Sequence, residues 1–103
     1  MDQDPRYKEL VENLTQKTKT GKLKWEPTVS DNTFVASIFG EYSLTLEADN
    51  YIYLTLRDAY DREIFRVGNH QIIELTELFE IAREQALKVN ETVDKLLEKL
   101  KVM

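Results

Sequence analysis

The sequence predicts a single α+β domain: an amphipathic helix at its start, an antiparallel β-meander of about five strands, and a long or kinked C-terminal helix packed on one sheet face. Three observations support this. Apolar residues recur at helical spacing near the start, alternate with polar residues through the middle, and return to helical spacing from about residue 70. At 103 residues, without repeats or linker-like segments, residues 1–103 are expected to form one domain.

The first helix is predicted over residues 4–20. Asp4 can cap the exposed amides of a helix start, and Pro5 suits the first helical position. Gly21 is a typical residue for the stop. One apolar stripe runs along this segment at helical spacing: Tyr7, Leu10, Val11 and Leu14.

The middle of the chain is predicted to form short strands, because apolar and polar residues alternate there. The links between these segments are brief and rich in Gly, Asp and Asn. Brief links permit only antiparallel neighbours, since parallel strands need a long crossover. The expected strands are 22–26, 33–39, 42–47, 51–57 and 63–67.

The register of the strand at 33–39 is left open by the sequence. A two-residue turn at Gly40-Glu41 would place Phe39 on the same face as Tyr42, whereas a three-residue turn would place Ile38 there. This strand is apolar on both faces, so hydrophobicity does not choose between the two registers.

The C-terminal segment returns to helical period from about His70. The spacing fits one long helix, but Asn90 followed by Glu91 resembles a new helix cap and favours a break near Val89-Asn90. The apolar stripe comprises Leu75, Leu78, Phe79, Ala82, Ala86 and Val89, and continues through Val93, Leu96, Leu97 and Leu100.

Composition and charge argue against several classes of protein. The net charge of −5 disfavours a general nucleic-acid binder, which usually carries a basic face. The absence of cysteine removes disulfides, thiolate metal sites and cysteine nucleophiles. The start, Met1 to Pro5, is polar, and the apolar runs are far shorter than a membrane span. We therefore expect a cytoplasmic protein without membrane contact.

No residue in the sequence is favoured as a catalytic residue or as a ligand of a metal or cofactor. His70 is the single histidine, with no ligand cluster or nucleophile elbow in the sequence to support it, so we interpret it as a turn or cap residue. An enzyme with a carboxylate-only site is the least favoured hypothesis, because the acidic residues gather at turns. Those carboxylates are Glu41, Glu47, Asp49, Asp58, Asp61 and Glu63.

The favoured hypothesis is a non-enzymatic interaction module that self-associates, as a homodimer, or that binds another protein. Tyr51 and Tyr53 lie on the strand face opposite Ile52 and Leu54, and tyrosine is enriched at interfaces. The candidate interface residues are Thr45, Tyr51 and Tyr53 on the sheet, and Val93, Leu96, Leu97 and Leu100 on the last helix.

A basic cluster supports the alternative hypothesis, a weak nucleic-acid or phosphate binder. Gly21-Lys22 lacks the context of a phosphate loop, since a helix precedes it and residue 16 is Gln rather than Gly. The same lysines also suit the negative end of the first helix. The cluster consists of Lys17, Lys19, Lys22 and Lys24.

Three stretches, taken in order, resemble a family of small bacterial or phage-like proteins of unassigned function. They are KTKTGKLKWEP at 17–27, FVASIFGEYSL at 34–44, and LFEIAR at 78–83 leading into Asn90. The resemblance implies a bacterial or phage-like intracellular protein. It implies no activity and no catalytic residue.

Overall fold

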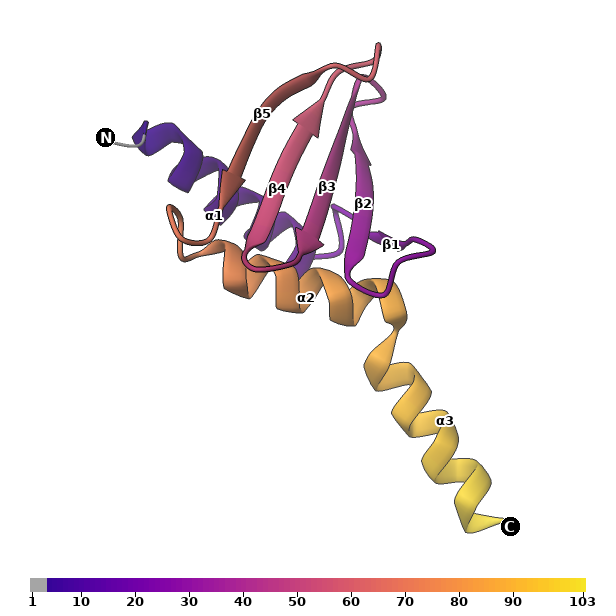
Figure 1. Cartoon of the computed structure of the whole chain (residues 1–103). Coiled ribbons are helices and arrows are strands. Elements are labelled where there is room, and N and C mark those ends of the chain that lie inside the picture. The colour runs from indigo at the N-terminus through magenta and orange to yellow at the C-terminus, as the bar shows by residue number, and fades with distance from the viewer. Residues whose placement is uncertain (1–3) are drawn as a thin grey trace.

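The computed structural model describes residues 4–103; residues 1–3 of the start that was predicted to be polar lie outside the described part. The chain runs from helix α1 (Pro5–Lys19) through an antiparallel sheet to helices α2 (Leu75–Leu87) and α3 (Val89–Lys101) (Figure 1). The strands are β1 (Glu26–Pro27), β2 (Thr33–Ile38), β3 (Tyr42–Ala48), β4 (Ile52–Arg57) and β5 (Glu63–Gly68). The predicted α+β class is confirmed.

The five strands lie in the order β1-β2-β3-β4-β5, and every neighbouring pair is antiparallel, as expected of a meander. The first strand differs from its prediction at 22–26. β1 holds only Glu26 and Pro27, which pair with β2. Leu23 and Trp25 are buried as the alternation predicted, but their backbone lies outside the ladder. The amide N–H groups of Lys22 and Leu23 donate instead to the carbonyl of Lys17.

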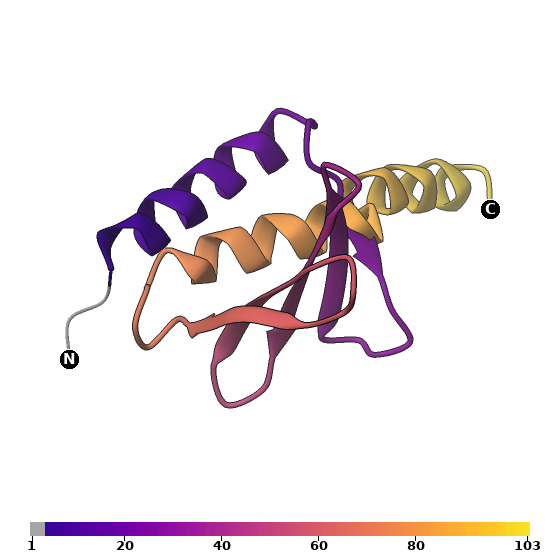
Figure 2. The same cartoon turned by 90° about the horizontal axis from the view of Figure 1, so that it is seen from above.

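One face of the sheet is covered by two helices. Figure 2 shows α1 and α2 side by side on this face, with α2 against the strands. The ring of Tyr7 in α1 also reaches Phe65 in β5, at 5.0 Å between centroids. The largest fully buried side chains lie between these layers: Val11, Phe34, Leu44, Leu46, Leu54, Leu75 and Leu78.

The register of β2 is resolved in favour of the three-residue turn. Ile38 pairs with Tyr42 and packs against the core. Phe39 and Gly40 both have positive φ, 57° and 69°, and the N–H of Glu41 donates to the carbonyl of Ile38. The Phe39 side chain is therefore directed outwards and is 85% exposed.

The ends of α1 follow the local signals in the sequence. The Asp4 carboxylate accepts from the N–H of Arg6 at 2.9 Å, and Pro5 is the first helical residue. Hydrogen bonds from the Arg6 side chain and then its backbone hold the pKa of Asp4 below its ordinary value. Gly21, at φ 76°, follows the last turn.

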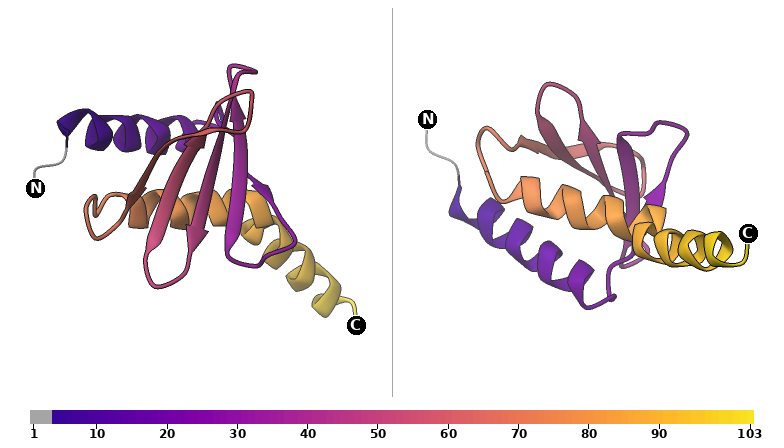
Figure 3. Two further views of the ribbon diagram at one scale, coloured as in Figure 1. Left: turned by 45° about the horizontal axis from the view of Figure 1, so that its top comes forward. Right: turned by 90° about the horizontal axis from the view of Figure 1, so that it is seen from below.

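The expected break in the C-terminal helix is present, at Lys88. This residue is left-handed (φ 53°, ψ 48°) and separates α2 from α3. Asn90 was expected to cap the second helix; instead, its side chain donates to Glu84 at 2.6 Å and Lys88 occupies the cap position. The α2 helix covers the sheet, while α3 leads away from it and extends the molecule to 56 Å (Figure 3).

Candidate interaction surfaces

The α3 helix carries a continuous apolar surface that the rest of the chain leaves open. Every residue from Asn90 to Lys101 is exposed. We call the set Val93, Leu96, Leu97 and Leu100 the α3 stripe; these side chains are 48%, 54%, 51% and 61% exposed. The sequence predicted all four as interface residues, and the structure places them together on one helix.

The exposed apolar residues of the loops and turns are scattered. Val29, Tyr60 and Ile73 lie in separate loops, and Phe39 lies in the β2–β3 turn. Single exposed apolar residues are normal on a protein surface. The α3 stripe is different because its members recur at helical spacing, which aligns them along one side of the helix.

The position of α3 relative to α2 is fixed by a few local contacts. The N–H of Lys88 donates to the carbonyl of Gln85, and the N–H of Thr92 donates to the carbonyl of Lys88. The Asn90 to Glu84 bond adds a side-chain link. A helix of 13 residues is marginal in water unless packing supports its apolar side. The α3 stripe therefore lacks the burial that ordinarily stabilises such a helix.

The second predicted surface, around Thr45, Tyr51 and Tyr53, lies on the sheet face that the helices leave uncovered. Thr45 is central in β3, and Tyr53 pairs with Gly68 across β4 and β5. The Arg66 guanidinium lies 4.4 Å above the Tyr53 ring and 3.6 Å from the Glu47 carboxylate. Intramolecular contacts therefore already occupy much of this polar surface.

His70 lies next to these tyrosines, a placement that sequence reasoning missed. It follows β5 in a turn, and its ring is 4.4 Å from that of Tyr51. A Cβ built on Gly68 would lie 2.5 Å from the imidazole, so a residue without a side chain suits this approach. The glycine two residues before His70 was the available signal.

One of the four lysines is paired with a carboxylate, and the other three border hollows beside β2. Lys19 forms an ion pair with Glu77 of α2 at 3.2 Å. Lys17 and Lys22 border a hollow of about 330 Å³, which is lined mainly by apolar side chains from α1 and β2. Lys22 also borders a second hollow, of about 390 Å³, together with Lys24 and residues of β2. Folding thus pairs one lysine of the predicted cluster with a carboxylate and leaves Lys17, Lys22 and Lys24 along two hollows that share Lys22.

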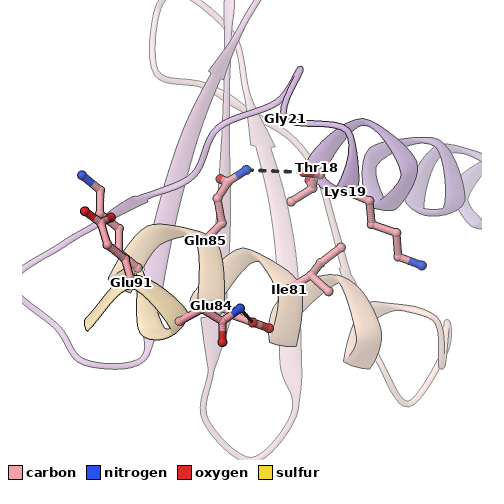
Figure 4. Close-up of a pocket in the computed structure, with 9 residues that line it drawn as sticks. Thr18, Lys19, Gly21, Ile81, Glu84, Gln85 and Glu91 are labelled. Atoms are coloured by element: carbon pink, nitrogen blue, oxygen red, sulfur yellow. Dashed lines mark hydrogen bonds between the residues drawn. The ribbon is translucent and has the colours of Figure 1, made fainter. Parts of the chain in front are cut away.

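Another hollow, of about 470 Å³, lies where α1, α2 and α3 meet (Figure 4). Gln85 enters it from α2 and accepts from the N–H of Trp25. Its amide nitrogen donates to the carbonyls of Leu23 at 3.0 Å and Thr18 at 3.4 Å. Gln85 therefore joins the segment before β1 to α2. The sequence signal was a glutamine inside the apolar stripe of α2, next to Ala86.

Among the acidic residues at the strand ends, Asp58 stabilises the turn in which it lies. Asp58 accepts from the N–H groups of Tyr60 and Arg62 at 2.9 and 3.0 Å, and its other oxygen meets the Arg62 side chain at 2.8 Å. Hydrogen bonding from Arg62 is the main cause that lowers the pKa of Asp58. Within residues 4–103, no group of three His, Cys, Asp or Glu side chains is placed to hold a metal ion.

Comparison with protein-family models, curated proteins and solved structures gives no match to this chain. The resemblance to small bacterial proteins therefore stays a prediction. Among the described helices, none is long and apolar enough to cross a membrane.

Proposed function

We propose that this protein is a non-enzymatic interaction module that self-associates as a homodimer through the α3 stripe. One observation carries the proposal: α3 presents four large apolar side chains at about half exposure and extends away from the folded body. An amphipathic helix that nothing covers is the usual form of a surface that docks on another chain.

The expected affinity follows from the size of the stripe. Burying a leucine or valine fully stabilises by about 1.5–3 kcal/mol, so covering the open half gives about 1 kcal/mol each. Two copies of the four residues then contribute about 8 kcal/mol, from which association removes at least about 4 kcal/mol. The remainder, about 4 kcal/mol, corresponds to a weak dimer with a dissociation constant on the order of 1 mM.

The α3 stripe is better suited to this role than the tyrosine-bearing sheet face. On the sheet, the Tyr53 ring is covered by Arg66, whose charge is in turn matched by Glu47. A partner binding there would have to replace these contacts. On α3 the apolar side chains face solvent, so a partner gains burial without displacing any contact within the chain.

Sedimentation equilibrium between about 10 µM and 1 mM tests the proposal up to the expected dissociation constant, where about half of the chains should be dimeric. The weight-average mass should rise from 12.1 kDa towards twice that value. The double variant Leu96→Glu and Leu100→Glu should remain monomeric, because it places four carboxylates in the paired stripe.

The matched control is Val29→Glu, which changes a fully exposed loop valine and should associate like the parent chain. Fluorescence of the single tryptophan, buried Trp25, would verify that each variant is folded. A parent chain that stays monomeric up to 1 mM would contradict the proposal.

A further inference from the structure

We infer that the occupant of the α3 stripe is α3 of a second copy running antiparallel, so that two helices pair about a two-fold axis. The inference rests on the proposed function, because it requires that the chain self-associates. It adds the relative orientation of the two helices and the charged residues that determine this orientation.

Charged and polar residues flank the α3 stripe along its two sides, which we call its borders. At about 100° per residue, Asp94 and Lys101 lie on the border next to Leu97, two turns apart. The opposite border carries Thr92 and Lys99.

The side of α3 away from the stripe carries one ion pair within the helix and the further carboxylate of Glu98. There, Glu91 and Lys95 form an ion pair at 3.3 Å. Asp94 and Lys101, in contrast, have no ion-pair partner among residues 4–103. One border of the stripe therefore holds two opposite charges that are available to another chain.

An antiparallel pair satisfies both of these charges. When two helices are related by a two-fold axis across their length, each border meets the same border of the other helix. Asp94 then faces Lys101 of the second copy, and the reverse contact forms at the other end. A parallel pair brings the two different borders together, which sets Lys101 almost level with Lys99 of the second copy. Like charges at that spacing repel.

The same register also fits the apolar side chains and the folded bodies. It places Leu97 near the two-fold axis and Val93 opposite Leu100 of the second copy. Because α3 leads away from the sheet, the two bodies lie at opposite ends of the pair (Figure 3). Opposed helix dipoles add a small favourable contribution.

Disulfide trapping tests the orientation directly, because the natural chain has no cysteine. We would prepare Val93→Cys and Leu100→Cys as separate full-length proteins and oxidise each alone and mixed, near 1 mM. The mixture should give a mixed disulfide as the main product, and Val93→Cys alone should give little. In the antiparallel pair its two copies are separated along the axis by about seven residues, or about 10 Å, beyond disulfide reach.

Charge reversal provides a second, independent readout. Asp94→Lys should weaken dimerisation about tenfold, because two attractive contacts become repulsive. Glu91→Lys makes the same change on the far side of the helix and is expected to have less than about a twofold effect.

The failures of the two proposals are distinguishable. A chain that never dimerises overturns the proposed function. A dimer whose Val93→Cys protein crosslinks efficiently with itself overturns the antiparallel arrangement alone. A dimer that forms neither type of crosslink and ignores Asp94→Lys shows that α3 is not the interface.

Discussion

Replacing Gln85 with leucine should destabilise the fold, because one side chain satisfies three backbone groups. Its oxygen accepts from the N–H of Trp25, and its nitrogen donates to the carbonyls of Leu23 and Thr18. A leucine of similar size leaves those groups without this partner. Each lost hydrogen bond removes about 0.5–1.5 kcal/mol, so we expect the free energy of unfolding to fall by about 2–4 kcal/mol. For a domain of this size, that corresponds to a melting temperature lower by at least about 10 °C.

Urea unfolding followed by Trp25 fluorescence measures this loss where it originates, since the Trp25 indole is buried and its backbone N–H is one of the affected groups. Gln16→Leu is the matched control: the same change on the exposed side of α1, with an expected effect within about 0.5 kcal/mol. If both variants lose the same small amount, below about 1 kcal/mol, the hydrogen bonds of Gln85 do not hold the segment before β1 onto α2.

Three further predictions each change one residue in a turn or between two helices. Asp58→Asn should lower stability at neutral pH and flatten its decline in acid. The lowered pKa of Asp58 means that its contribution is complete at neutral pH and is lost as pH falls below about 4, which urea titrations at several pH values would detect. Phe39→Asn should raise the free energy of unfolding by about 0.5–1 kcal/mol, because asparagine tolerates positive φ and the lost ring was exposed; an unchanged urea midpoint would contradict this. Lys88→Gly should keep the break between α2 and α3, whereas Lys88→Ala should favour a continuous helix, and NMR secondary shifts at residues 86–90 would distinguish them.

Local signals in the sequence were sufficient for most of the secondary structure. Asp4, Pro5 and Gly21 mark the ends of α1, where the structure has them. The alternation of apolar residues predicted β2 to β5 within one residue at every end, and the short links predicted the order of the sheet. These features depend on neighbours in the chain, so a single sequence contains them.

The features that the sequence left open or misplaced depend on contacts between distant residues. Leu23 and Trp25 alternate like a strand, but Gln85, some 60 positions later, takes the backbone hydrogen bonds of that segment. Asparagine is a typical residue at a helix cap, yet the side chain of Asn90 donates to Glu84 on the preceding helix. One lysine of the predicted cluster, Lys19, is paired with Glu77, a residue of α2 that lies 58 positions later in the chain.

The α3 stripe could be identified from spacing, but its exposure could not. The apolar positions continue from Ala82 and Ala86 through Val93 with the same helical period. The spacing of apolar residues does not indicate where the surface that buries them ends. The sheet is long enough to bury α2 only, so the identical pattern is core before Lys88 and surface after it.

The left-handed conformation of Lys88 sets the direction in which α3 leaves α2. A residue with a side chain in this conformation is disfavoured by about 1–2 kcal/mol, and a change at this one position would continue α2 straight into α3. A difference of about 1.4 kcal/mol changes a population ratio tenfold, which is within the range that binding a partner can supply. The direction of α3 therefore depends on one residue, and a partner that covered the α3 stripe would act on the conformation of residue 88 in addition to an apolar surface.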